Sequence, residues 1–252
     1  SAGPRTPAPG SQVNYDNGVQ HGNSQVSFSH DDSSDDQPWG HVWAIDPKDR
    51  FRIVFANIGG FPVDSRDPKM EAIQHYTMAL NAQAIGLTEC NVHWKKVPAF
   101  ARLHERTMGW FEALGINTAY FERYAAGAPF QPGGVSLWSI GVGVHRTQST
   151  GQDSSGLGRW AWTRYRGRQG INLRVVTAYR PVLNTSGALS VWSQQKSHFE
   201  AQDDDRCPRD IFIVDILKEV QAWKEEGDQI VIGIDANEDV RTGKLAKAFR
   251  DE

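Results

Sequence analysis

The residues with the clearest chemical potential lie where apolar segments end. Asp235 follows the β-branched run 229–234, and Asn237 comes two positions later. Asn57 and Glu89 end two further apolar runs nearer the N-terminus. Carboxylate and carboxamide oxygens are the ligands that Mg²⁺ and Mn²⁺ prefer. Because open α/β sheets gather such side chains at the carboxyl ends of parallel strands, we expect them to meet at one edge.

A second group of candidates is basic, and we expect it to contact nucleic acid. Three of its arginines alternate along the acid-free segment 159–168, so a strand would place them on one face. Aromatic residues between them suit base stacking, although a solvated hairpin with arginines over aromatic rings has the same pattern. Two lysines follow the Glu89 segment, where an ordinary surface loop is the alternative. The group consists of Arg164, Arg166, Arg168, Lys95 and Lys96.

These side chains need a framework of strands and helices to position them. Apolar runs bounded by Gly, Pro and Asn predict strands, and apolar residues at helical spacing predict helices. The predicted strands are 52–57, 84–89, 134–144, 159–166, 171–179 and 229–235. The predicted helices are 68–81, 100–114, 210–225 and 244–249. This mixture of helical crossovers and hairpins predicts an α/β fold.

The chain divides into a tail and one domain. Residues 1–40 are rich in Ser, Gly, Pro, Asn, Gln and Asp, and they include the acidic run 31–36. Such a composition cannot bury enough apolar surface to offset the entropy of ordering, so we expect a flexible, low-complexity tail. Residues 41–252 then form the globular domain.

Composition narrows the classes of function. Of the 252 residues 39% are hydrophobic, enough for a sizeable core, and the net charge of −3 does not indicate a general nucleic-acid binder. The sequence has no apolar stretch of about 18 residues and no signal-peptide pattern, so we expect no membrane partner. Two cysteines are too few for a disulfide framework and favour a reducing compartment inside the cell, nuclear or cytoplasmic.

The order of the motifs resembles the endonuclease/exonuclease/phosphatase superfamily, which includes abasic-site endonucleases and the endonucleases of non-LTR retrotransposons. The resemblance rests on Asn57, Glu89, the Gly-Gly strand 133–138, Thr-Ala-Tyr-Arg-Pro at 177–181 and Asp-Ala-Asn at 235–237. It implies a four-layer α/β sandwich, with two mixed sheets face to face and helices outside.

The resemblance also implies a role for each candidate. Glu89 would be the main ligand of Mg²⁺ or Mn²⁺, with Asn57 beside it, and the metal would polarise the scissile phosphate. Asp235 would orient or deprotonate the attacking water as a general base. Asn237 and Tyr179 would donate hydrogen bonds to phosphate oxygens.

The sequence departs from the family pattern at its end. Family members continue with a Ser-Asp strand and an Asp-His pair, whereas this chain stops at Glu252. We therefore expect a C-terminally incomplete sandwich, in which a downstream segment or a polypeptide partner completes the sheet. Whether this chain alone is an active enzyme stays open.

The function implied is that of an Mg²⁺-dependent phosphodiesterase, first of all a DNA endonuclease domain of retroelement or repair type. DNA or RNA would be its partner, and Arg180 joins the expected contacts because it neighbours Tyr179 at the mouth of the site. Two alternatives stay open. One is a phosphatase or phosphodiesterase of small phosphorylated molecules or lipid headgroups, and the other is a non-catalytic module that binds nucleic acid or protein.

Overall fold

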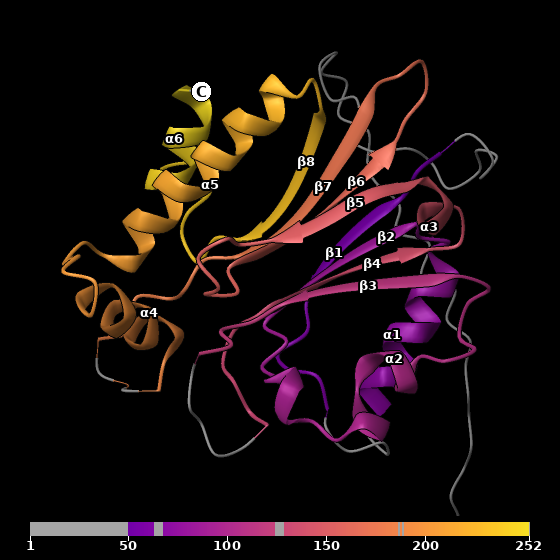
Figure 1. Cartoon of the computed structure of the whole chain (residues 1–252), viewed down its shortest axis with the longest axis horizontal. Helices are drawn as coiled ribbons and strands as arrows, with labels where there is room; N and C mark the ends of the chain where they lie inside the picture. The colour runs from indigo at the N-terminus through magenta and orange to yellow at the C-terminus, as the bar shows by residue number, and fades with distance from the viewer. Residues whose placement is uncertain (1–49, 63–67, 124–128, 186, 188, 252) are drawn as a thin grey trace, which may run out of the picture. The chain divides into compact units, whose positions relative to one another are not determined.

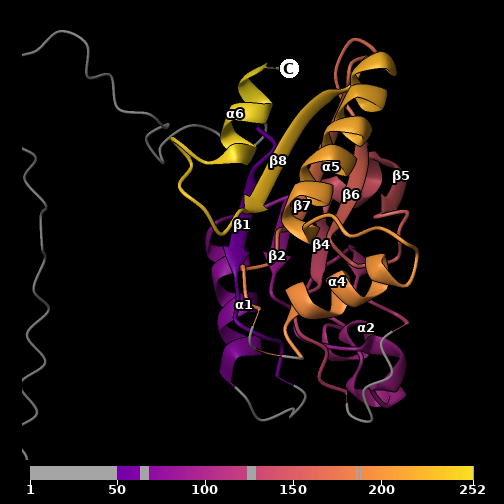
Figure 2. The same cartoon turned by 90° about the vertical axis from the view of Figure 1, so that its left-hand side faces the viewer.

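The computed structural model describes residues 50–62, 68–123, 129–185, 187 and 189–251 (Figure 1). The tail predicted over 1–40 and the first residues of the predicted domain lie outside this set. In the described part, two four-stranded sheets stack against each other, and helices cover their outer faces (Figures 1 and 2).

The first sheet comes from the first half of the described chain. Its strand order is β1-β2-β4-β3, where β1 and β2 run parallel and the other neighbours are antiparallel. Its strands are β1 (Ile53–Asn57), β2 (Ala84–Thr88), β3 (Leu114–Ala119) and β4 (Val135–Ile140). Its outer layer contains α1 (Pro68–Ala79), α2 (Leu103–Arg106) and two 3₁₀ turns, η2 (Trp94–Lys96) and η3 (Ala99–Ala101).

The second sheet comes from the second half, in the order β5-β6-β7-β8, and only β7 and β8 among these neighbours are parallel. Its strands are β5 (Thr147–Gln152), β6 (Trp160–Arg166), β7 (Asn172–Tyr179) and β8 (Gln229–Asp235). The short helix α3 (Val142–Arg146) joins the two halves. The outer layer contains α4 (Val191–Glu200), α5 (Pro208–Glu225) and α6 (Lys244–Asp251).

Apolar side chains fill each space between these layers. Trp138 packs with the helices of the first sheet, while its neighbour Leu137 packs between the sheets. Val175 likewise faces the first sheet, and Val176 faces α5. Because successive side chains of a strand point to opposite faces, strands buried on both faces hold two cores at once. The predicted α/β sandwich with two mixed sheets is confirmed.

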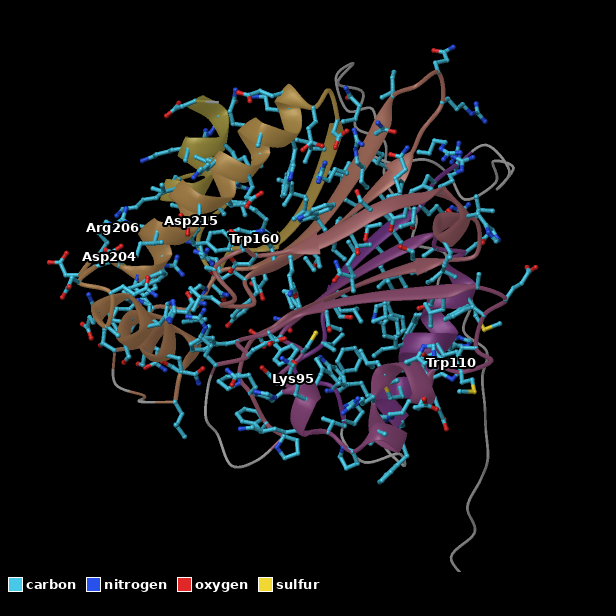
Figure 3. The ribbon with its side chains drawn as sticks, in the orientation of Figure 1. Lys95, Trp110, Trp160, Asp204, Arg206 and Asp215 are labelled. Atoms are coloured by element: carbon cyan, nitrogen blue, oxygen red, sulfur yellow. The ribbon has the colours of Figure 1, made fainter. Side chains whose placement is uncertain are left out.

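The predicted helix 100–114 is wrong. Only the 3₁₀ turn and α2 form there, and the chain then bends at Gly109 (φ +78°) into β3. The apolar residues in this segment still enter the core, although not from a helix. Trp110 (labelled in Figure 3) packs against Trp138 between the first sheet and its helices. The predicted strand 134–144 is shorter than expected, since Gly141 takes a φ of +52° directly after β4.

Several elements have no counterpart among the sequence predictions. They are the strands β3 and β5, the helices α3 and α4, and the 3₁₀ turn η2. No helix in the described residues combines the length and the apolar character that crossing a membrane requires.

Candidate active site

The edge strands β1 and β8 approach each other around one aromatic ring. Phe55 of β1 occupies the space that side chains would take at Gly86 of β2 and Gly233 of β8. A Cβ atom at Gly86 would lie 2.5 Å from the ring, and one at Gly233 would lie 2.1 Å from it. Glycine at both positions therefore lets the two sheets close around Phe55.

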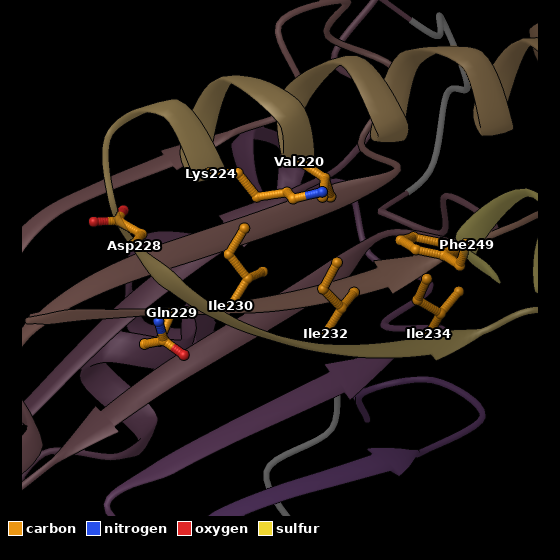
Figure 4. Close-up of a pocket in the computed structure, with 8 residues that line it drawn as sticks. All are labelled: Val220, Lys224, Asp228, Gln229, Ile230, Ile232, Ile234 and Phe249. Atoms are coloured by element: carbon orange, nitrogen blue, oxygen red, sulfur yellow. The ribbon is translucent and has the colours of Figure 1, made fainter. Parts of the chain in front are cut away.

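Side-chain alternation decides what β8 presents to the space between the sheets. Every second residue from Ile230 to Ile234 points outward, into an apolar groove of about 500 Å³ below α5 and α6 (Figure 4). Asp235 shares the opposite parity with Gly233, so its carboxylate faces inward. On β1, Asn57 shares the inward parity of Phe55. The two polar side chains thus meet just beyond the ring.

Asn57 and Asp235 form a hydrogen bond between the two sheets. Asn57 Nδ2 donates to Asp235 Oδ2 at 2.8 Å, and Asn57 Oδ1 accepts the Gly59 N–H at 2.9 Å. Turning the amide over would set its oxygen against the carboxylate, so these two bonds fix its orientation. The pair lines a cavity of about 260 Å³ at the open side of the sandwich.

Glu89 and Tyr179 form the second half of the site. Glu89 follows β2 with a φ of +52°, a left-handed conformation that glutamate rarely adopts. A continued strand would turn its side chain toward the helices, as at Leu87. Its carboxylate instead lies near the Tyr179 hydroxyl and acts on the pKa of that group. Burial and the charges of Glu89 and Asp235 raise the pKa of Tyr179, so this hydroxyl keeps its proton at neutral pH.

Asn237 lies in the loop after β8 and also has a left-handed backbone, with φ +50°. Its Nδ2 donates to Arg180 O at 2.9 Å, and the Arg180 N–H donates to Asp235 O at 3.0 Å. These bonds join the loop after β8 to the end of β7. The Asn237 side-chain NH₂ group has two N–H donors, and the bond to Arg180 O uses one of them.

The oxygen donors at this edge suit a hard divalent cation. Neither Glu89 nor Asp235 forms an ion pair within the described part of the chain. Mg²⁺ is commonly held by one or two carboxylates together with water. A zinc-type cage would need more ligands, and the described residues contain no group of three or more His, Cys, Asp or Glu side chains that could hold a metal.

No protein-family model and no curated protein matches the sequence. Solved structures do match. The 3′-5′ exonuclease NExo from Neisseria meningitidis is 15% identical with a TM-score of 0.42, over 73% of this chain and 56% of that chain. D. rerio TDP2, complexed with a single-strand DNA product, is 12% identical with a TM-score of 0.42, over 79% and 64%. The mannosyl-6-phosphatase Bt3783 from Bacteroides thetaiotaomicron is 11% identical with a TM-score of 0.46, over 80% and 70%.

The chain spans little more than half the length of the exonuclease. At these identities and TM-scores the likeness assigns no activity and no residue role, so the roles must come from the site itself.

The three alternating arginines lie at the opposite end of the second sheet. Arg166 pairs in register with Asn172 at the start of β7, whereas Trp160 lies beside Ala178 near the site. The seven-residue strand β6 separates the two ends by about 20 Å. Arg164 is bound to the buried Asp228 by several hydrogen bonds, and Arg168 lies in the following turn. The structure therefore does not place this row beside the candidate site.

Arg180 also differs from expectation. Its side chain is only 1% exposed and forms an ion pair with Glu238, so its guanidinium is not available to a nucleic acid. Lys95 and Lys96 lie in η2, shortly after Glu89. Lys95 is exposed but paired with Glu122 (Figure 3).

The sequence analysis did not identify the side chains that fix the loops around the candidate site. Asn91 Oδ1 accepts the Gly133 N–H at 2.8 Å and ties the Gly-Gly loop to the segment after Glu89. Glu238 and Arg209 hold the loop after β8. The left-handed φ at Asn91 (+55°) resembles that at Glu89, but no sequence signal marks it.

Proposed function

We propose that this chain is a divalent-metal-dependent phosphodiesterase domain that acts on nucleic acid. The observation that carries the proposal is the convergence of two pairs from the two sheets, Asn57 with Asp235 and Glu89 with Tyr179. Left-handed backbone at Glu89 and Asn237 supports it, because residues in such conformations cluster at functional sites.

Each side chain has a distinct task in the proposed reaction. Glu89, with Asn57 beside it, would hold Mg²⁺ or Mn²⁺, which supplies Lewis-acid polarisation of the phosphate when bound. Asp235 keeps Oδ2 on the Asn57 amide and takes the proton of the attacking water on Oδ1. Tyr179, protonated at neutral pH, and the second N–H of Asn237 donate to phosphate oxygens as charge develops on them.

DNA is the proposed substrate, with an endonuclease of repair or retroelement type as the first version of the proposal. Lys95 and Lys96 lie close to Glu89 in sequence and would contact the phosphate backbone. The unpaired Cys90 and Cys207 support a reducing compartment, nuclear or cytoplasmic.

We also propose that a further polypeptide segment or a partner chain adds a strand to one of the two sheets. In the described part of the chain β1 and β8 each end a sheet, and Phe55 and Val231 on them are more than one-third exposed. Unpaired strand edges with apolar side chains are templates for a further strand.

A second candidate function has one observation in its favour. Val182 and Leu183 follow Tyr179 closely, and both are exposed, as is Leu189. Apolar side chains at the rim would suit a phosphodiester with an apolar part, such as a lipid headgroup carried on its acyl chains. Hydrolysis of a lipid phosphodiester without cleavage of DNA would favour this function.

The test is a cleavage assay on the full chain. Supercoiled plasmid, an abasic duplex, inositol phosphates and lipid phosphodiester vesicles are incubated with Mg²⁺ or Mn²⁺, with and without EDTA. We expect nicking of DNA that EDTA and Glu89→Gln both abolish. Glutamine keeps the shape of the side chain, and Glu225→Gln at the exposed end of α5 is the matched control.

Two outcomes would contradict the proposal. Nicking that persists in Glu89→Gln or in EDTA would rule out this site. No cleavage of any substrate by the wild-type chain, together with DNA binding that survives Asp235→Asn, would identify a non-catalytic binding module instead.

A further inference from the structure

An arginine–carboxylate pair joins the parallel strands β7 and β8 at each end. Arg174, near the start of β7, binds Asp228, which directly precedes β8. Arg180, directly after β7, binds Glu238, which follows β8. Both arginine side chains are at most 2% exposed. The two pairs have similar chemistry, but only the second lies beside the candidate active site.

Arginine N–H groups hold three consecutive carbonyl oxygens in the loop after β8. Arg180 donates from its backbone N–H to Asp235 O at 3.0 Å, and from Nη1 to Ala236 O at 3.5 Å. Arg209, on α5, donates from Nη2 to Asn237 O at 3.1 Å. The backbone from the proposed general base onward is therefore held by the Arg180 backbone N–H and by two guanidinium groups that are at most 12% exposed.

Glu238 connects these arginines to α6. Its Oε2 binds Arg180 Nη1 and lies 3.5 Å from Arg209 Nη2. Its Oε1 accepts the Leu245 N–H at 2.7 Å, in the first turn of α6. Burial disfavours its charge, but the hydrogen bonds from Arg180 and Leu245 outweigh burial and lower the pKa of Glu238. The carboxylate is therefore ionised at neutral pH and balances the two cations.

We propose that Arg180, Glu238 and Arg209 are positioning residues for the candidate active site, an inference that rests on the function proposed above. They act through the backbone of the loop that carries Asp235 and Asn237. This role replaces the expectation that Arg180 contacts nucleic acid. A general base must be held within a fraction of an ångström, and a shift of about 1 Å can cost about 100-fold in rate.

The test measures kcat and KM for DNA cleavage in Glu238→Gln, Arg180→Lys and Arg180→Gln. Glutamine keeps an acceptor for the Leu245 N–H but removes the charge that pairs with Arg180. We expect kcat to fall about tenfold to 100-fold, as for other residues that orient a reacting group, with KM within about twofold of wild type. Arg180→Lys, which keeps the charge, should lie between wild type and Arg180→Gln.

The pair at the other end of the strands is the matched control. Arg174→Gln and Arg174→Lys disturb another buried ion pair at the opposite end of β7, so they should lower stability and leave kcat unchanged while the chain is folded. Equal kcat in wild type and Glu238→Gln, or an equal loss in the Arg174 variants, would overturn the positioning role alone. Failure of the wild-type chain to cleave would instead contradict the proposed function, and this inference with it.

Discussion

Asn57 and Asp235 are 178 positions apart in the chain, yet Nδ2 of one lies 2.8 Å from Oδ2 of the other. Each residue ends the edge strand of a different sheet, so this contact exists only when the two sheets are correctly docked. The amide binds Oδ2 and leaves Oδ1 as the oxygen that the proposed function assigns to the attacking water. This division of the carboxylate is the basis for the first two predictions.

Asp235→Asn should abolish cleavage while preserving the fold. The carboxamide that replaces the carboxylate is similar in size and can still accept from Asn57, but it cannot take a proton from water. We expect single-turnover nicking to slow by about 100-fold or more, in line with the contribution of a general base. Asp251→Asn, on an exposed turn of α6, is the control. A loss of less than about threefold would exclude Asp235 as the base.

Asn57→Asp should change the pH dependence of the reaction. It sets two carboxylates within hydrogen-bonding distance, and such a pair binds a proton more tightly than either group alone. The acid limb of the pH–rate profile should move to higher pH by about one unit. Asn57→Ala removes the hydrogen bond without adding charge and should not move the limb upward. Superimposable profiles for wild type and Asn57→Asp would show that the side chains at 57 and 235 are not coupled in the reaction.

Gly233→Ala should destabilise the protein by forcing Phe55 out of its place. The added Cβ would lie 2.1 Å from the ring, and overpacking of this kind typically costs about 1–3 kcal/mol in the free energy of unfolding. Urea unfolding measures the change. Phe55→Ala in the same chain should recover part of the loss, giving a favourable coupling in a double-mutant cycle.

Gly115→Ala, on β3, is the control for that substitution. Its added Cβ would meet nothing closer than Ser139 at 3.9 Å, so its effect should be small. Equal destabilisation by both alanines would show that the Phe55 contact does not account for the effect, because the loss of glycine's backbone freedom by itself favours folding.

Asp228→Asn should reduce the amount of unfolding free energy that the protein loses when the pH is lowered. Burial opposes ionisation of Asp228, but hydrogen bonds from Arg164 and Arg174 outweigh it and lower its pKa. The pKa of aspartate in an unfolded chain is about 3.9, so the ionised Asp228 stabilises the fold above that pH. The contribution is lost as the pH falls through the lower, folded-state pKa. Unfolding free energies at neutral and acidic pH measure the slope, which should be smaller in Asp228→Asn than in wild type.

The same substitution should also lower stability at neutral pH, by up to about 3 kcal/mol, because Arg164 loses its carboxylate and Arg174 keeps only the half-exposed Glu226. An unchanged acid slope would show that other carboxylates dominate the acid response.

The strands that carry the candidate site were the most predictable part of the fold. Buried β-branched runs such as 229–235 have a strong local signal, and their polar ends follow directly from the sequence. The strand β3 was missed because Gly, Asn and Thr interrupt its apolar residues and all of its residues except Ala119 are only partly buried. The prediction of a helix over 100–114 was wrong because Trp110 and Phe111 pack into the core from a bent loop, so their apolar spacing does not reflect a helix.

The surroundings of the site were not predictable, because they depend on contacts between distant segments. The alternation of Arg164, Arg166 and Arg168 was visible, but the carboxylate that binds Arg164 lies 64 positions away. Arg180 and Glu238 are 58 positions apart, so nothing local marks them as partners. The catalytic and metal-binding roles of Glu89, Asn57, Asp235, Asn237 and Tyr179 remain predictions that the cleavage assay must test.

Each sheet is formed by one continuous half of the described chain, β1–β4 before residue 141 and β5–β8 after it. During synthesis the first half leaves the ribosome with Leu137 and Val135 on a face that the second sheet has not yet covered. That face is covered only as β6 and β7 arrive, and the Asn57–Asp235 contact waits for β8. Conditions that slow translation of the second half should therefore favour aggregation of the nascent chain and recruitment of chaperones.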